Sequence, residues 1–351
     1  MDRPQVTIKG RGAADSPQGR FEKLARSREA AEEVQSRPET VVTLHSARSI
    51  IARNDSPDLP FTQSINPYQG CEHGCIYCYA RPSHAYLGLS PGLDFETRIF
   101  AKENAAELLR KELSRPDYRC DLIALGANTD PYQPVERKHR ITRGILEVLW
   151  EFRNPVGIVT KGSLIERDFD VLEPMAREGL VQVFVSIGSL DGEIARTLEP
   201  RAAAPFRRVE TIRRLSASGV PCGVLVAPII PFLNDQDMEA VLEAAQDAGA
   251  RMAGYTVLRL PWEVKDLFKG WLERHYPLKA KHVMARIRDM RGGRDNDPNF
   301  GSRMKGKGQF AELLRNRFDL ACRRLGLNAE KRNRLDGTKF RRPGAPQGAL
   351  F

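Results

Sequence analysis

The feature that most constrains the fold is an alternation of short apolar segments with amphipathic segments between residues 61 and 268. The apolar segments are nearly continuous runs of aliphatic and β-branched residues, which is typical of parallel strands covered on both faces. The segments between them repeat apolar residues at steps of three and four, which predicts helices. Such strand–helix repeats fold through right-handed crossovers into a mainly parallel sheet. We expect strands at residues 62–68, 121–127, 156–160, 181–187, 222–229 and 253–260.

These strands predict an α/β fold, an open partial (β/α)6 barrel, because a closed barrel of this kind needs eight strands. Ligands of parallel sheets bind where the strands end, at their carboxyl ends. The helices expected between the strands cover residues 103–113, 141–152, 165–179, 206–219 and 235–249.

Three regions are predicted along the chain. Residues 1–60 are polar and lack periodicity, which indicates a partly ordered N-terminal extension. Residues 61–268 form the barrel core, and residues 269–351 form a basic helical C-terminal region and tail. We expect helices at 277–290 and 308–326 to cap the open side of the barrel.

The positive charge is concentrated in the C-terminal region. The chain has 55 Lys and Arg against 45 Asp and Glu, a net of +10. Residues 269–342 hold 21 basic and 8 acidic residues, a net of 21 − 8 = +13, so the remainder carries 10 − 13 = −3. Within this region we expect residues 286–308 to form an exposed loop and residues 331–344 to form a frayed tail. The charge fits either a solvated surface or a patch that follows the phosphates of DNA or RNA.

The composition is that of a globular protein, with 41% apolar and 28% charged residues. No apolar run approaches the about 18 residues of a membrane-spanning helix, so no membrane partner is expected. The first residues lack the apolar core of a secretory signal. Six cysteines are too few for a disulfide framework in a chain this long. We therefore expect the protein to work in the reducing cytoplasm.

Half of the cysteines lie in one short segment directly after the first predicted strand. Cys71, Cys75 and Cys78 have the spacing C-x3-C-x2-C. Three thiolates on one short loop can wrap a single metal centre. A [4Fe–4S] cluster normally takes four thiolates, so three leave one iron free to bind a substrate or cofactor. The spacing therefore favours a catalytic iron–sulfur cluster.

Two other interpretations of this segment remain. A structural zinc site needs a fourth ligand, for which His73 and His84 are the nearby candidates, although C-x-H-x-C is too compact for good zinc geometry. The cysteines could also bind no metal. The remaining cysteines, Cys120, Cys222 and Cys322, are scattered and are interpreted as ordinary thiols. Cys120 begins the second predicted strand and is also considered as a hydrogen donor.

The cysteine spacing, with aromatic Tyr77 before the last cysteine, resembles the signature of the radical S-adenosylmethionine (SAM) superfamily. The stretch INPYQGCEHGCIYCYARPSHAYLGLSPGLDFETRIF is similar to the spore photoproduct lyase-like branch, often labelled DNA repair photolyase, and to an uncharacterised bacterial subgroup of it. The resemblance covers about residues 61–268. It implies a [4Fe–4S] cluster and SAM as cofactors, with Cys71, Cys75 and Cys78 as the cluster ligands.

The resemblance also implies a set of SAM contacts at several strand ends. SAM carries an ammonium, a carboxylate and a sulfonium, so acidic, basic and hydroxyl groups suit it. The lysine of VTKGSL is implied to contact the carboxylate, the serine of VSIGSLD to bind SAM, and ANTD to hold the amino group. The implied set is Tyr77, Asn128, Thr129, Asp130, Lys161, Ser186 and Ala227. The run that begins EPRAAAPFRR is similar to the family as well, with Glu199, Arg201 and Arg207 in matching places.

One position departs from the resemblance. The lyase has a cysteine just after its second strand that quenches the thymine radical, and Asn128 stands there in this sequence. Cys120 lies at the other end of the strand and does not replace it. Reversal of thymine dimers is therefore not expected of this chain.

The resemblance implies reductive cleavage of SAM to methionine and a 5′-deoxyadenosyl radical, which abstracts hydrogen from a substrate. It also implies an electron donor such as a flavodoxin or ferredoxin. A nucleic acid is the leading hypothesis for the substrate. The alternatives are modification of a protein, peptide or small metabolite, and a non-catalytic iron–sulfur or zinc protein that binds nucleic acid.

Overall fold

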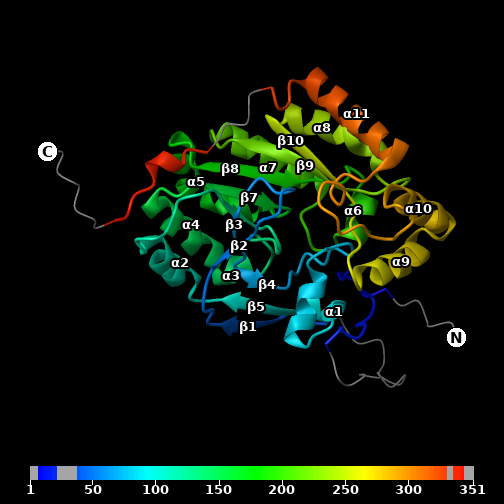
Figure 1. Cartoon of the computed structure of the whole chain (residues 1–351), viewed down its shortest axis with the longest axis horizontal. Coiled ribbons are helices and arrows are strands. Elements are labelled where there is room, and N and C mark those ends of the chain that lie inside the picture. Colours follow the sequence, from blue (N-terminus) through cyan, green and yellow to red (C-terminus); the bar gives the residue numbers. More distant parts are fainter. Residues whose placement is uncertain (1–6, 22–37, 330–334, 344–351) are drawn as a thin grey trace.

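The computed structural model describes residues 7–21, 38–329 and 335–343. Its centre is a seven-stranded sheet with the order β10-β9-β8-β7-β6-β3-β2 (Figure 1). Six of these strands run parallel and match the predicted ones, while β2 (Ile51–Arg53) pairs antiparallel with β3 at one edge. The edge strands β10 and β2 do not pair, so the sheet is open and the predicted partial barrel is confirmed. The parallel strands are β3 (Gln63–Ile65), β6 (Ile123–Leu125), β7 (Val156–Thr160), β8 (Val181–Ser186), β9 (Cys222–Ile229) and β10 (Met252–Val257).

The predicted crossover helices are all present. Figure 1 shows α2, α4 and α5 on one side of the molecule and α6, α9 and α10 on the other. Short elements that the sequence did not predict lie between them, among them α1 (Leu93–Thr97), α3 (Glu136–His139) and α6 (Gly192–Leu198). The crossover helices are α2 (Ala105–Ser114), α4 (Ile141–Phe152), α5 (Phe169–Arg177), α7 (Pro205–Ala217) and α8 (Met238–Asp247).

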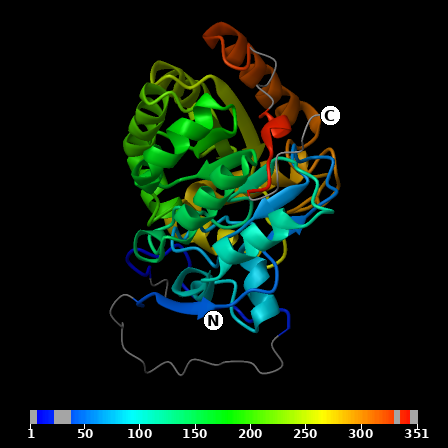
Figure 2. The same cartoon turned by 90° about the vertical axis from the view of Figure 1, so that its left-hand side faces the viewer.

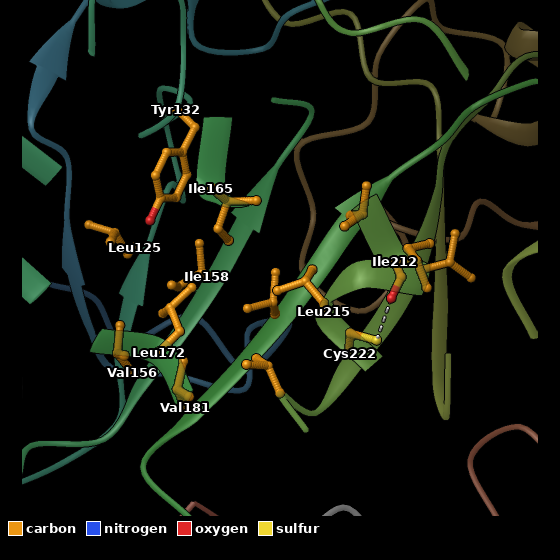
Figure 3. Packing of buried hydrophobic residues seen from close by; sticks show 14 of the residues in the cluster. Leu125, Tyr132, Val156, Ile158, Ile165, Leu172, Val181, Ile212, Leu215 and Cys222 are labelled. Carbon is orange, nitrogen blue, oxygen red and sulfur yellow. Dashed lines mark hydrogen bonds between the residues drawn. The ribbon is translucent and has the colours of Figure 1, made fainter. Parts of the chain in front are cut away.

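The core lies between the parallel strands and the helices that cover them. Figure 3 shows Val156 and Ile158 of β7 close to Leu172 of α5, and Cys222 of β9 beside Ile212 of α7. All of these side chains are buried. Each fully buried aliphatic side chain contributes about 1.5–3 kcal/mol of transfer free energy. The positions of the strand ends are therefore set by a continuous apolar core.

A second sheet forms from segments far apart in the sequence. It has the order β1-β5-β4, built from β1 (Val41–His45), β5 (Arg98–Lys102) and β4 (Tyr68–Gln69). Strands β1 and β2 both lie within residues 1–60, where the sequence predicted none. These strands are short, and β1 pairs with a segment more than fifty residues away, Arg98–Lys102. Local periodicity carries no signal for such pairing.

Within the described residues, three α-helices follow the last parallel strand: α9 (Val264–His275), α10 (Pro277–Met290) and α11 (Gly308–Leu325). The sequence predicted α10 and α11 but not α9. Helix α11 packs against α8, and α10 packs against α9 and α11 (Figure 1 and Figure 2). Apolar residues of α9 and α10 share a cluster with Cys75, Ile76 and Tyr77. These two helices therefore support the cysteine segment from outside the sheet.

The loop between α10 and α11 is largely exposed, as its Gly and Arg content predicted, but it is anchored by a buried arginine that the sequence did not reveal. Arg291 is only 3% exposed, and its guanidinium donates to the carbonyls of Ser302 and Leu258 at 3.0 and 2.8 Å. The backbone N–H of Val257 in β10 donates to the carbonyl of Met304 at 2.9 Å. The loop therefore covers part of the edge strand β10, and its buried arginine satisfies backbone carbonyls.

The basic tail also differs from the prediction of a frayed end. Phe340 packs on Tyr118 and Phe152, with ring centroids 5.4 and 6.3 Å apart. The Arg342 guanidinium donates to the carbonyl of Arg115 at 2.9 Å. Residues 335–343 are thus docked on the barrel, whereas the rest of the predicted tail lies outside the described residues. Within the ranges that the structure covers, no helix combines the length and apolar character needed to cross a membrane.

The buried guanidinium of Arg291 predicts a large effect of its removal. Arg291→Ala leaves several buried carbonyls without a donor, so we expect the free energy of unfolding to fall by about 3 kcal/mol. Arg294→Ala is the control, because Arg294 is an exposed residue of the same loop. Urea unfolding of both variants measures the difference, and equal midpoints would contradict the assigned role.

Candidate functional site

The cysteine segment is a loop between β4 and the 3-10 helix η1 (Arg81–Leu87). Cys71 and Cys75 are buried, Cys78 is half-buried, and all three are free thiols. The backbone N–H of Cys71 donates to the carbonyl of Phe95 at 2.9 Å, and that of Ile76 donates to the carbonyl of Leu198 at 3.0 Å. Backbone hydrogen bonds therefore fix the loop to the segments around Phe95 and Leu198.

A buried ion pair holds the loop from beneath. Arg81 is fully buried and donates to the carbonyls of Gly74 and Cys75 at 3.1 and 2.9 Å, while it also pairs with the carboxylate of Glu96. Glu96 in turn accepts hydrogen bonds from the backbone N–H groups of Gly12 and Ala13 at 3.0 and 2.9 Å. A buried ion pair is stable only when further hydrogen bonds satisfy both ions, and here they do.

The N-terminal segment lies directly on the cysteine loop. A Cβ atom on Gly12 would lie 1.9 Å from the carbonyl oxygen of Gly74. Gly74 has a φ of +69°, a conformation that L side chains rarely adopt. Glycine is therefore required at both positions for the two backbones to touch.

Burial sets the protonation of the three thiols. It raises the pKa of Cys71 and Cys78, and it raises the pKa of Cys75 to about 12 although the nearby Lys161 lowers it. The thiols are therefore protonated at neutral pH when no metal is bound. A coordinated metal deprotonates a thiol outright, so metal binding here releases protons.

A second buried network flanks the loop on the side of the strand ends. The hydroxyl of Tyr77 donates to Glu199, and the guanidinium of Arg208 pairs with the same carboxylate. Arg208 also donates to the carbonyl of Ser186 at 2.8 Å. Burial raises the pKa of Glu199, but Arg208 and Lys161 outweigh it and leave the pKa lowered. Glu199 is therefore ionised, and it balances the cations beside the cysteines.

The segment after β6 is organised around the carboxylate of Asp130. It accepts from the Thr160 hydroxyl and from the backbone N–H of Lys161, both at 2.7 Å, and it lies 3.3 Å from His73 Nδ1. Burial raises the pKa of Asp130, but His73 and these hydrogen bonds lower it to about 2. The hydroxyl of Thr129 donates to the carbonyl of Tyr68 at 2.8 Å. Both side chains thus already have partners within the protein.

The other candidate positions follow neighbouring strands. Asn128 is exposed after β6, and Lys161 follows β7 with its Nζ 5.9 Å from the centroid of the Tyr77 ring. Ser186 ends β8, and its hydroxyl donates to the carbonyl of Ala227 in β9 at 3.2 Å. These positions lie at or near the carboxyl ends of parallel strands, at the edge of the sheet where ligands bind.

Three comparisons place this geometry among known proteins. The sequence model of the Radical SAM superfamily matches residues 65–245, more than half of the chain. The chain belongs to the radical SAM superfamily.

The relatives with similar sequences are uncharacterised proteins. An uncharacterised protein of Mycobacterium tuberculosis is 37% identical over 254 residues, which cover 71% of this chain and 74% of the relative. An uncharacterised protein of Methanocaldococcus jannaschii is 26% identical over 213 residues, which cover 61% of this chain and 76% of the relative.

Solved structures show the same fold. A spore photoproduct lyase complexed with a dinucleoside spore photoproduct superposes with a TM-score of 0.59 and 16% identity, over 82% of this chain and 80% of the lyase. A variant lyase with bound AdoMet and dinucleoside spore photoproduct gives a TM-score of 0.58 and 15% identity, with the same coverage. The chain is a radical SAM enzyme with the lyase-like fold, which excludes the interpretation as a non-catalytic binding protein.

Radical SAM membership implies a [4Fe–4S] cluster and SAM, and the donor set of this chain fits them. The three thiols are soft ligands on one loop, and each thiolate of such a cluster binds a different iron, so they need not converge on one point. A zinc site needs several ligands around one ion, and among the described residues no three Cys, His, Asp or Glu side chains are grouped in that way. His73 faces Asp130, and His84 Nε2 lies 3.0 Å from the carbonyl oxygen of Arg98. Neither histidine is placed as the fourth ligand of a zinc site.

The sequence did not reveal the groups that position the radical SAM loop. Arg81, Glu96 and Arg208 look like surface residues in the sequence, and only their burial shows their role. Of the family-matched positions, Glu199 joins the Tyr77 network, whereas Arg207 pairs with Glu166 on the outer helices. Arg201 pairs with the buried Glu72 of the cysteine loop at 2.9 Å. Cys120 lies beside Asn154 and Gly337 at the opposite strand ends.

The ion pair beneath the loop yields a testable prediction. Glu96→Gln leaves the Arg81 charge buried without its partner, so we expect the free energy of unfolding to fall by about 3–5 kcal/mol. The exposed pair of Arg115 and Asp117 provides the control, since solvent screens it and Asp117→Asn is expected to leave the unfolding midpoint nearly unchanged. Denaturant unfolding of the metal-free proteins measures both, and similar losses would contradict the role of Glu96.

Proposed function

We propose that this enzyme binds a [4Fe–4S] cluster through Cys71, Cys75 and Cys78 and cleaves SAM reductively. The observation that carries the proposal is the buried loop with three free thiols beside the strand ends of a radical SAM barrel. When bound, the cluster supplies the electron that splits SAM into methionine and a 5′-deoxyadenosyl radical, which takes a hydrogen atom from the substrate. The protein holds the reactants in place and keeps competing hydrogen donors away.

Different residues of the chain are proposed to bind different groups of SAM. Lys161 is proposed to pair with the SAM carboxylate, because its pKa is raised by Cys75 and Glu199 although burial lowers it, so it stays charged. Asn128 and Ser186 are proposed to offer polar groups from neighbouring strand ends. Asp130 and Thr129 are already bonded within the protein, so we propose that they shape the segment that receives the SAM amino group.

Tyr77 and Ala227 complete the proposed SAM site. Tyr77 belongs to the cysteine loop, its hydroxyl donates to Glu199, and it is proposed to close the SAM site on the cysteine side. Ala227 presents backbone in β9 next to Ser186, where a small residue leaves room for the cofactor.

A nucleic acid remains our leading proposal for the substrate. The chain shares its fold with a spore photoproduct lyase that was solved with a dinucleoside spore photoproduct. At the strand ends, the guanidinium of Arg259 lies 5.3 Å from the centroid of the half-exposed Tyr79 ring, and Arg259 Nε is buried without a hydrogen-bond partner among the described residues. A nucleic-acid base can stack on an exposed aromatic ring, and a neighbouring arginine can bind the phosphate.

Another observation favours a peptide or small metabolite as the second candidate. Several cations of the C-terminal region are neutralised within the protein: Lys269 and Arg288 pair with Asp295, and Arg317 pairs with Glu239. Charges that are paired internally attract phosphates less strongly. The basic region is therefore weaker support for nucleic acid than its net charge suggests.

The proposed setting is the reducing cytoplasm, because all six cysteines are free thiols. A low-potential electron donor such as a flavodoxin or ferredoxin is part of the proposal.

Cys75→Ala tests the cluster and the chemistry together. Loss of one of three ligands is expected to lower iron after anaerobic reconstitution and to abolish the formation of 5′-deoxyadenosine from SAM with dithionite. Cys120→Ala is the matched control, because Cys120 lies at the other strand ends, and it should keep both. Iron analysis and chromatography of the products give the result. Full turnover by Cys75→Ala with unchanged iron would overturn the cluster assignment.

The substrate class is tested by isotope transfer. Anaerobic turnover with SAM and a deuterated oligonucleotide, peptide or metabolite is expected to place deuterium in 5′-deoxyadenosine only with the true substrate. Binding of the oligonucleotide should also weaken steeply as salt rises from about 50 to 200 mM, since its phosphates release counterions. Deuterium transfer from a peptide, together with binding of the oligonucleotide that does not depend on salt, would replace the nucleic-acid proposal.

A further inference from the structure

A pocket of about 310 Å³ lies on the outer side of the cysteine loop. The N-terminal segment 7–14 forms one wall, and residues near the ends of α6 and α9 form the other. None of the proposed SAM-binding residues lines it. A partner bound here would therefore leave the strand ends free for SAM and substrate.

The pocket is positively charged. Lys9, Arg196 and Arg274 line it, and none of the three forms an ion pair with any residue that the structure describes. Arg274 Nε is buried and has no hydrogen-bond acceptor among those residues. The lining contains no Asp or Glu, and His275 is neutral at pH 7 because burial and Arg274 lower its pKa. These charges favour an anionic partner.

The lining residues form the thin layer that separates solvent from the cysteine loop. Gly12 touches Gly74, and a Cβ atom on Gly74 would lie 3.3 Å from Pro200 Cγ. Ala13 belongs to the same apolar cluster as Cys75. One layer of chain therefore lies between this pocket and the loop that carries the thiols.

An electron must enter the proposed cluster from outside the molecule, and its transfer slows steeply with distance. The pocket combines a single layer of chain over the cysteine loop with positive charge that has no ion-pair partner among the described residues. Lys9 and Arg196 are exposed at its rim, where they can reach across to the surface of a second protein. Opposite charges on two such surfaces steer encounter and fix the orientation of the complex.

We propose that this basic pocket is the docking site of an acidic flavodoxin-type electron donor. The donor would give up one electron, so that its flavin hydroquinone becomes the semiquinone, and the electron would reduce the cluster that Cys71, Cys75 and Cys78 would hold. The inference rests on the proposed function, because it assigns the entry point of the electron that SAM cleavage consumes.

The test uses the double variant Arg196→Glu/Arg274→Glu. Titration calorimetry with an acidic oxidised flavodoxin, at low salt, is expected to give a dissociation constant raised by roughly tenfold or more. SAM cleavage driven by reduced flavodoxin should fall by a similar factor, whereas cleavage driven by dithionite should not change. The control variant Arg315→Glu/Arg323→Glu changes the net charge equally, on exposed positions of α11, and should behave as the unaltered protein.

The outcomes separate this inference from the proposed function. If the unaltered protein cleaves no SAM with dithionite, the proposed function fails, while calorimetry still tests the docking site. If both double variants bind flavodoxin equally well, the docking site is wrong even though SAM cleavage stands. Inorganic pyrophosphate serves as a small anionic probe: if it binds the pocket without displacing flavodoxin, the pocket holds a small anion instead, and the proposal is overturned.

Discussion

The cysteine loop depends on a formal charge pair buried beneath it. Removing Arg81 and Glu96 from water is costly, and the cost is offset only because each group is surrounded by hydrogen-bond partners. Those partners are the carbonyls of Gly74 and Cys75 and the backbone N–H groups of Gly12 and Ala13. One ion pair thereby fixes the cysteine loop and the N-terminal segment in a single arrangement.

The parallel sheet forms the second half of the candidate site. The ion pair of Arg81 and Glu96 positions only the cysteine loop. The parallel strands end at the same edge of the sheet, so Lys161 and Ser186 follow paired positions of β7 and β8 although 24 residues lie between them in the chain. Asp130 joins the two halves, since it accepts from the N–H of Lys161 and faces His73 of the cysteine loop. The loop can therefore move relative to the strands only if this buried carboxylate loses its partners.

The sequence predicted the parts of the fold that have local signals and missed those that do not. Apolar runs and helical periodicity predicted the six parallel strands and their crossovers, and the cysteine spacing with its resemblance predicted the family. Strand β1 was missed because it pairs with the distant β5, and the buried charges were missed because Arg81 and Glu96 resemble surface residues. The burial of Arg291 was missed because composition does not show which backbone carbonyls need a donor.

The distribution of paired charge changes where a partner is expected. Counting residues places the positive excess in the C-terminal region, yet several of the cations there bond internally, as Arg291 does to carbonyls and Arg303 to Asp58. Few basic residues lie beside the cysteine loop, but two of them, Lys9 and Arg196, have no acidic partner in the described chain. Attraction depends on charge left uncompensated at a surface, and net charge by region does not measure it. The outer face of the cysteine loop is therefore a candidate site for an acidic protein, although the residue count does not single it out.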